Sequence, residues 1–302
     1  MAEFLTILHN DGLQPNTIAG YRSAIGVIHS GFQDNSTVSN NPIIHRLIAG
    51  SFITRPPVSR LVPAWSLTLV LRKLAGPPFE PMQTASLKYL SLKCAFLLSF
   101  ASARRVSQIT ALSIDKDHLV WLQDGVQLST RAGFLAKNQR INFNPEPIVI
   151  RSMGSFSSRE EDLVWCPVRA LKMYMERTET LRGGCTQLFI KCIAPHNGIR
   201  PPTLASWIVE TIKLSYPAET SPDTFMEGEP NRPNPRAHDV RGVSASWAKF
   251  HKVPIESILQ AATWKSETTF ATCYVKDVFQ AENQFSMRVL STSASAAGAA
   301  PT

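Results

Sequence analysis

Five residues in the last two-thirds of this chain have side chains that could act together on a phosphate group. Two are arginines, Arg105 and Arg241, whose planar guanidinium groups match pairs of phosphate oxygens and stay protonated at any working pH. His238 lies three residues before Arg241, and Trp264 and Tyr274 follow. A phenol has a pKa of about 10, so a tyrosine attacks an electrophile at neutral pH only when a base takes its proton.

The order and spacing of these residues resemble the active site of tyrosine recombinases. The first box of that family reads approximately Thr-Gly-Leu-Arg-Ile-Ser-Glu-Leu, and residues 102–109, SARRVSQI, align with it, with Arg105 at the arginine. The second box, His-x-x-Arg, is matched by His238 and Arg241. The third element is a His or Trp nine or ten residues before the nucleophilic tyrosine, matched by Trp264 and Tyr274. Each box alone occurs often by chance, so the resemblance depends on their joint order.

This resemblance implies a site-specific DNA recombinase or integrase that uses neither a metal nor a cofactor. The two guanidinium groups would neutralise the charge that builds on the phosphate in the transition state, and Trp264 would donate its indole N–H to the same phosphate. His238 would act as the base. Tyr274 would attack the phosphorus and form a covalent 3′-phosphotyrosine, which stores the energy of the broken bond for religation.

In the family, a lysine on a β-hairpin turn supplies a proton to the departing deoxyribose oxygen. Lys137 follows two strand-like runs and is the matching candidate, with Arg131 and Arg140 as residues that could be mistaken for the same element.

Two positions depart from the family pattern. Gln108 stands where the family commonly has an acidic residue, and an amide can hydrogen-bond the arginine but cannot fix it by charge. Ser102 and Ala103 replace the usual small-residue–glycine pair. A catalytically silent DNA-binding derivative is therefore an alternative, whereas a type IB topoisomerase is disfavoured by the lack of a long basic linker and a large cap. Retention of both arginines, the histidine and the tyrosine favours an active enzyme.

Composition and charge agree with a protein that handles double-stranded DNA. The 302 residues are 44% apolar, enough for one large core and a smaller one, which predicts two domains. Residues 1–54 hold only two of the 31 basic and three of the 23 acidic side chains, so the remainder has an excess of nine positive charges. A surplus of this size favours a phosphate backbone as the partner.

The sequence contains no run of eighteen apolar residues and no basic-then-apolar leader, so we expect neither membrane insertion nor secretion. Its cysteines have no paired or histidine-bracketed spacing, which predicts free thiols in a reducing compartment and no metal site. They are Cys94, Cys166, Cys185, Cys192 and Cys273.

The N-terminal region predicts a small helical domain followed by a linker. Three short helices are expected, near residues 4–8, over 16–29 with Asn16 as the cap, and near 43–48. Proline-rich residues 55–64 predict an extended linker. Residues 1–54 resemble a truncated core-binding (SAM-like) bundle. The family usually has four or more helices there, so we expect the reading frame to begin inside a longer one.

Residues 65–290 predict a mainly α (α+β) catalytic domain, helical with a small antiparallel sheet. A buried helix around residues 87–98 leads into the first box. Strands at 118–122 and 126–130 are joined through the turn signal Asp124-Gly125, and a third strand is expected at 148–150. Helices are expected from Pro167 and Pro201. We interpret the long loop between Tyr216 and Arg236 as an insertion rather than a lid.

The C-terminal region and the subgroup depend on shorter signals. Residues 278–290 predict a short amphipathic segment, which either docks on a neighbouring protomer, as in the synaptic tetramers of the family, or packs on its own domain. Residues 291–302 are expected to be disordered. The tryptophan in the third box and the CPVRAL segment at residues 166–171 resemble recombinases of eukaryotic DIRS-type retrotransposons. That subgroup implies a transposable element and a nuclear location.

Overall fold

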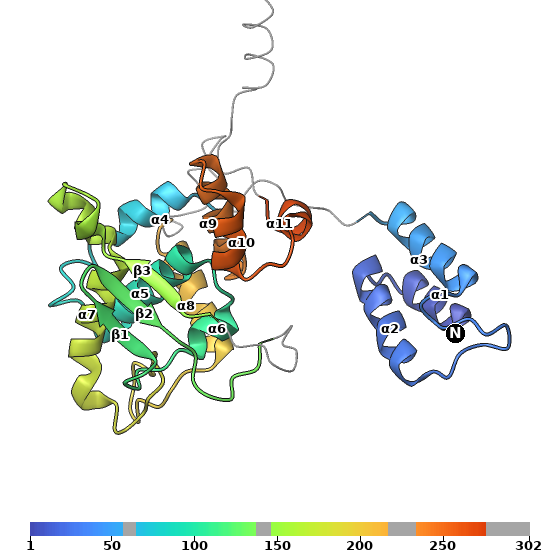
Figure 1. Cartoon of the computed structure of the whole chain (residues 1–302), viewed down its shortest axis with the longest axis horizontal. Helices are drawn as coiled ribbons and strands as arrows, with labels where there is room; N and C mark the ends of the chain where they lie inside the picture. Colours follow the sequence, from blue (N-terminus) through green and yellow to red (C-terminus); the bar gives the residue numbers. More distant parts are fainter. Residues whose placement is uncertain (57–64, 137–145, 217–233, 276–302) are drawn as a thin grey trace, which may run out of the picture. The chain divides into compact units, whose positions relative to one another are not determined.

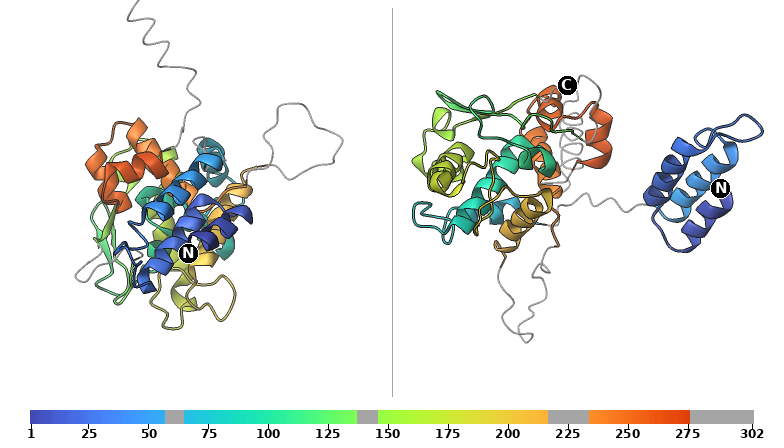
Figure 2. Two further views of the ribbon diagram at one scale, coloured as in Figure 1. Left: turned by 90° about the vertical axis from the view of Figure 1, so that its right-hand side faces the viewer. Right: turned by 90° about the horizontal axis from the view of Figure 1, so that it is seen from below.

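The computed structural model describes residues 1–56, 65–136, 146–216 and 234–275. The chain divides into two compact units, Met1–Arg60 and Leu61–Thr302, which are considered separately here (Figure 1, Figure 2). Of the helices in the described ranges, none has the length and apolar content needed to cross a membrane.

The first unit contains the three predicted helices, α1 (Ala2–Asn10), α2 (Pro15–Ile28) and α3 (Pro42–Thr54). The predicted cap of α2 was wrong by two residues. The helix starts at Pro15 because the fixed φ of proline suits the first helical position, where its missing N–H removes no hydrogen bond. Asn41 caps α3 by accepting from the amides of Ile43 and Ile44. The small core of this unit consists of Leu5, Ile18, Val38, Ile44 and Ile48.

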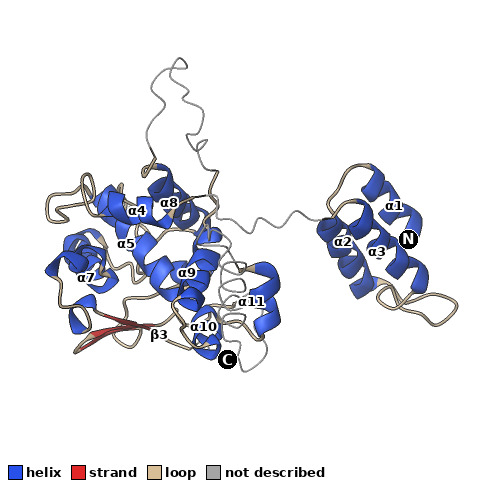
Figure 3. Cartoon of the chain, turned by 90° about the horizontal axis from the view of Figure 1, so that it is seen from above, coloured by secondary structure: helices blue, strands red, loops and turns tan. Residues whose placement is uncertain are grey.

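The second unit is mainly helical with one antiparallel sheet, as the sequence predicts (Figure 3). Its α-helices are α4 (Leu67–Leu74), α5 (Leu87–Ser102), α6 (Val106–Thr110), α7 (Pro167–Thr178), α8 (Pro201–Lys213), α9 (Asp239–Phe250), α10 (Ile255–Ala262) and α11 (Glu267–Cys273). Its strands are β1 (Leu119–Leu122), β2 (Gly125–Leu128) and β3 (Ile148–Arg151), in the order β1-β2-β3. Short 3-10 turns occupy Met153–Ser155, Glu160–Trp165 and Glu179–Leu181.

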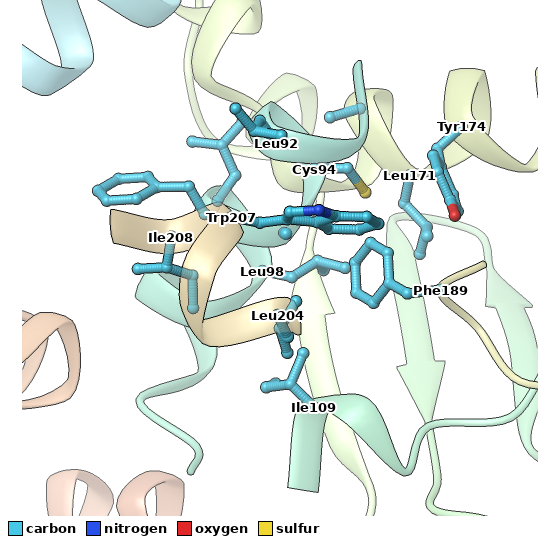
Figure 4. Packing of buried hydrophobic residues seen from close by; sticks show 14 of the residues in the cluster. Leu92, Cys94, Leu98, Ile109, Leu171, Tyr174, Phe189, Leu204, Trp207 and Ile208 are labelled. Atoms are coloured by element: carbon cyan, nitrogen blue, oxygen red, sulfur yellow. The ribbon is translucent and has the colours of Figure 1, made fainter. Parts of the chain in front are cut away.

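Helix α5 is the centre of this unit. An unbroken run of buried residues from Leu90 to Ser99 covers every side of the helix, which is the pattern of a helix enclosed by other elements. It packs against α7, α8, α9 and β3. Figure 4 shows part of this core, where Trp207 of α8 lies beside Phe189 with ring centroids 6.1 Å apart. The helix that ends at the first box is therefore held on all sides.

The hairpin forms as predicted, but its turn is displaced by one residue. Leu122 pairs with Gly125, so the turn residues are Gln123 and Asp124 and the glycine is already in β2. A Cβ at Gly125 would lie 2.3 Å from the carbonyl oxygen of Ile150 on β3. The glycine is required by this close approach of two backbones rather than by the turn conformation.

One buried ion cluster joins the segment after α4 to helices α5 and α7. The ammonium group of Lys93, on α5, is fully buried and donates to Glu80 Oε1 at 2.5 Å and to the carbonyl of Leu74 at 2.8 Å. Arg169 of α7 donates to the same carboxylate oxygen at 2.9 Å. Burial opposes ionisation of Glu80, but the hydrogen bonds and charges of Arg169 and Lys93 outweigh it and hold its pKa below the ordinary value of 4.5.

We predict that Glu80→Gln lowers the free energy of unfolding by about 3 kcal/mol, because it leaves the ammonium group of Lys93 buried without a counter-charge. The loss should be complete above pH 4.5 and should shrink as the pH falls through the lowered pKa of Glu80, where the wild type loses the same charge. Urea unfolding across pH 3–7 measures both effects. Glu210→Gln, which breaks the exposed pair with Lys88, is the control and should cost less than about 0.5 kcal/mol. Equal losses in the two variants would contradict a special role for the buried cluster.

Candidate active site

The first box lies where α5 ends and α6 begins. Ala103 ends α5 in the left-handed conformation, with φ 50°, and turns the chain toward Arg105, the residue that precedes α6. Gln108 is buried, and its Oε1 accepts from the backbone N–H of Arg105 at 3.1 Å. The amide therefore fixes the arginine through its backbone, a task that needs an acceptor but not a negative charge.

The second box opens α9. His238 immediately precedes the helix, and Arg241 follows one turn later on the side that faces the protein interior. Ser244 donates to the carbonyl of Phe100 at 2.5 Å, which ties α9 directly to α5. The two boxes are thus attached to the same central helix.

Arg241 is 2% exposed, yet most of its hydrogen-bonding capacity is unused. Its Nη2 donates to the carbonyl of Ala262, at the end of α10. Its Nε and Nη1 are buried and have no partner among the described residues. The guanidinium carbon lies 4.6 Å from the ring centre of Trp264 and 5.1 Å from that of Tyr274, so aromatic faces replace a counter-ion.

Trp264 follows α10 directly and is 7% exposed. The helix ends at Thr263 in the left-handed conformation, with φ 54°, and this reversal directs the indole into the site. Its ring stacks on Phe270 of α11 with centroids 5.2 Å apart. The Nε1–H is buried and, like the two Arg241 donors, has no acceptor in the described part of the chain.

Tyr274 follows α11 and reaches the same place. Its hydroxyl lies 3.1 Å from Nε2 of His238, and its ring centre lies 4.4 Å from that of Trp264. The carbonyl of Tyr274 accepts from the hydroxyl of Ser246 on α9 at 3.4 Å. Helix α9 therefore contacts both the side chain and the backbone of the tyrosine.

Positive charge dominates the electrostatics of this cluster. Burial, reinforced by the charge of Arg105, lowers the pKa of Arg241 to about 10, which still leaves it protonated at neutral pH. Burial and the charge of Arg241 also lower the pKa of His238, and Arg105 and Arg236 act in the same direction. His238 is consequently neutral at pH 7 and can accept a proton.

The structure brings five of the six predicted site residues into one cluster, namely Arg105, His238, Arg241, Trp264 and Tyr274. Lys137 and Arg140 lie outside the described residues, as does the segment 276–302. Arg131 is exposed after β2. In the ranges that the structure describes, no group of three or more His, Cys, Asp or Glu side chains is placed to hold a metal ion.

Sequence reasoning missed three residues of this cluster. Arg104 is buried, and its charge adds to the field on Arg241. The sequence feature that could have identified Arg104 is the Arg-Arg pair in the first box. Ser246 and Phe270 contact the tyrosine and the tryptophan, respectively. Phe270, four residues before Tyr274, could have been found from helical spacing, whereas Ser246 carried no signal.

No protein-family model matches this sequence, and no curated protein matches it. Among solved structures, the chain is similar to the XerH site-specific recombinase in its post-cleavage complex with palindromic difH substrate. The TM-score is 0.54 at 13% identity, over 97% of this chain and 70% of that one. Similarity to a lambda integrase (75–356) dimer bound to a COC′ core site has a TM-score of 0.49 at 13% identity, over 93% and 80% of the two chains. For XerA recombinase the values are 0.45 and 17%, over 97% and 89%. The likeness to XerH shows that the chain has the fold of a tyrosine recombinase.

We predict that Arg241→Met raises the free energy of unfolding by about 1–2 kcal/mol, because it removes a buried cation whose donors are largely unsatisfied. Arg182→Met is the matched control. Arg182 is equally buried, but its terminal nitrogens donate to Thr178 and to the carbonyls of Gln187 and Leu188, so its loss should cost about 2–4 kcal/mol. Urea unfolding of both variants gives the comparison. A loss of stability in Arg241→Met would contradict the view that this guanidinium is uncompensated.

Proposed function

We propose that this protein is a site-specific DNA recombinase or integrase that cuts and rejoins DNA through a covalent 3′-phosphotyrosine at Tyr274. The observation that carries the proposal concerns buried N–H donors of Arg241 and Trp264 that have no acceptor in the ranges the structure describes. These donors lie beside the place where a base and a tyrosine hydroxyl meet. A buried donor without an acceptor costs free energy, which an anionic ligand would recover.

A phosphodiester is the ligand that suits these donors. Two guanidinium nitrogens of Arg241, Nε and Nη1, have no acceptor among the described residues and could donate to phosphate oxygens. Arg105 adds a second positive charge, and the indole N–H of Trp264 supplies a further donor. Aromatic rings and low solvent exposure around Arg241 strengthen its electrostatic interaction with charge that develops on the phosphate.

The covalent step follows from the contact between His238 and Tyr274. With its ring proton on Nδ1, neutral His238 accepts the phenolic proton at Nε2, 3.1 Å away. The tyrosine oxygen then bonds to phosphorus as the bond from phosphorus to the 5′ oxygen breaks. That oxygen leaves with a proton, for which we propose Lys137 as the donor. Attack by the 5′ hydroxyl of another strand reverses these bonds and releases the tyrosine.

The proposal extends to partners and context. Double-stranded DNA is the substrate, the working form is a homotetramer on paired sites, and no metal or cofactor takes part. By resemblance of the third box and residues 166–171, the protein belongs to a eukaryotic DIRS-type transposable element and acts in the nucleus. Gln108 supports activity rather than decay, because its hydrogen bond to the Arg105 backbone does not require an acidic side chain.

The test is a suicide-substrate assay in EDTA. The substrates are a pool of nicked duplexes, some with random sequences and some with sequences from the flanking repeats of the element. Cleavage next to the nick releases a short fragment that diffuses away. The covalent complex then has no strand end with which to religate. We expect a protein–DNA band on a denaturing gel. DNA retarded on a native gel without that band would instead identify a silent DNA-binding module. Relaxation of supercoiled plasmid without strand exchange between sites would identify a type IB topoisomerase.

We predict that Tyr274→Phe eliminates the covalent band while changing the dissociation constant for DNA by less than about threefold, because only one hydroxyl is removed. Tyr216→Phe is the control, since the Tyr216 hydroxyl accepts from Ser66, outside the site, and its loss should leave cleavage intact. A covalent yield from Tyr274→Phe equal to that of the wild type would refute the assignment of the nucleophile.

We predict that Arg241→Lys lowers the cleavage rate by at least about 100-fold, equivalent to about 2.7 kcal/mol of transition-state stabilisation. An ammonium group keeps the charge but cannot present two parallel N–H groups to the phosphate. Single-turnover cleavage at saturating protein measures the effect apart from binding. An unchanged rate would show that Arg241 does not contact the reacting phosphate.

A further inference from the structure

The turn that carries His238 is closed by a reciprocal pair of hydrogen bonds. The amide of Asp239 donates to the carbonyl of Arg236 at 2.9 Å, and the amide of Arg236 donates back to Asp239 Oδ2 at 3.2 Å. The other carboxylate oxygen pairs with Nη2 of Arg236 at 3.3 Å. Asp239 is 8% exposed, so these bonds are its main compensation for burial. His238 is one of the two residues that lie between Arg236 and Asp239 in this turn.

The first box is built in the same way. The amide of Gln108 donates to the carbonyl of Arg105 at 2.9 Å, while the Gln108 side chain accepts from the Arg105 amide. In both boxes, the residue three positions after the start of the turn binds back to its first amide. The difference is that the second turn uses a charged residue and an ion pair.

We propose that Asp239 is a positioning residue for His238, and that the Arg236–Asp239 ion pair controls the local charge on its imidazole. This inference rests on the proposed function for its effect on cleavage. The carboxylate closes the turn that aims Nε2 at Tyr274, 3.1 Å away. The side chain of Arg236 is 70% exposed, so it balances the buried carboxylate from the solvent side.

Several charges compete at the ring. Among the described residues, the charged and titratable groups that act on it are Arg105, Arg236, Asp239, Arg241 and Tyr274. Burial and the charge of Arg241 lower the pKa of His238, Arg105 and Arg236 lower it further, and Asp239 is the negative charge that raises it. Removing Asp239 or Arg236 should therefore move the pKa of His238 in opposite directions, which a purely structural role cannot do.

The first test is the pH profile of single-turnover cleavage for three variants. Asp239→Asn keeps an acceptor but loses the charge. The midpoint of the fall in cleavage rate on the acid side of the profile (the acid limb) should therefore move down by about half a pH unit. Arg236→Gln should move it up by a similar amount. Asp239→Ala also loses the turn, so its plateau rate should fall below that of Asp239→Asn, by about tenfold or more, with little change in DNA affinity. Acid limbs that stay in place, or move in the same direction, would overturn the inference.

The second test needs no DNA and separates this inference from the proposed function. The chain has seven histidines, and His238→Gln identifies the His238 signal by its loss from the spectrum of histidine-labelled protein. NMR titration of the wild type, Asp239→Asn and Arg236→Gln should show the same opposite shifts in pKa. If they appear but wild-type protein cleaves no DNA, the charge control stands and the proposed function fails. If the wild type cleaves but the pKa of His238 does not respond, the proposed function survives and this inference is wrong.

Discussion

The buried guanidinium of Arg241 is the constraint around which the second unit is organised. A cation removed from water normally needs a counter-ion, but in the described part of the chain this one contacts a single carbonyl and two aromatic faces. Arg105 and Arg104 add charge of the same sign to its surroundings. The arrangement persists only because α9 is anchored to α5 and because Trp264, Phe270 and the end of α10 enclose the site.

The same unit contains the opposite solution to the same problem. Lys93 is fully buried as well, but Glu80 and the carbonyl of Leu74 satisfy its ammonium group. The chain thus neutralises the buried Lys93 cation with a carboxylate, whereas the buried Arg241 cation has no counter-ion among the described residues. Lys93 and Arg241 lie in the same folded unit. The difference in how their charges are compensated therefore depends on where each residue lies, not on a general tolerance of this unit for buried charge.

Much of the fold and most of the site could be predicted from the sequence, for identifiable reasons. Strong periodicity marked α5, and the three-strand sheet followed from β-branched runs with a turn signal between them. The two errors have different causes. Gly125 is required by its tertiary contact with β3 rather than by the turn. The start of α2 was misplaced for a local reason, because Pro15 suits the first helical position. His238 and Arg241 were identified by their match to the second box, and the structure shows that one turn of α9 separates them.

Contacts between distant segments were beyond sequence reasoning. Ser246 looks like any serine on a helix, and only the folded chain brings its hydroxyl to the carbonyl of Tyr274. The role of Gln108 was also hidden, because the sequence shows the residue type but not whether the arginine presents its guanidinium or its backbone N–H. Such backbone-directed contacts tolerate changes of charge, which explains how a box can depart from its family pattern and keep its geometry.

Both helices that lead into the site end in left-handed residues that are not glycine, Ala103 before the first box and Thr263 before Trp264. Such conformations cost roughly 1–2 kcal/mol for residues with a Cβ. Glycine at either position, or asparagine in place of Thr263, would adopt this conformation more readily. The two turns that place Arg105 and Trp264 therefore carry a conformational cost, which the packing around them must offset.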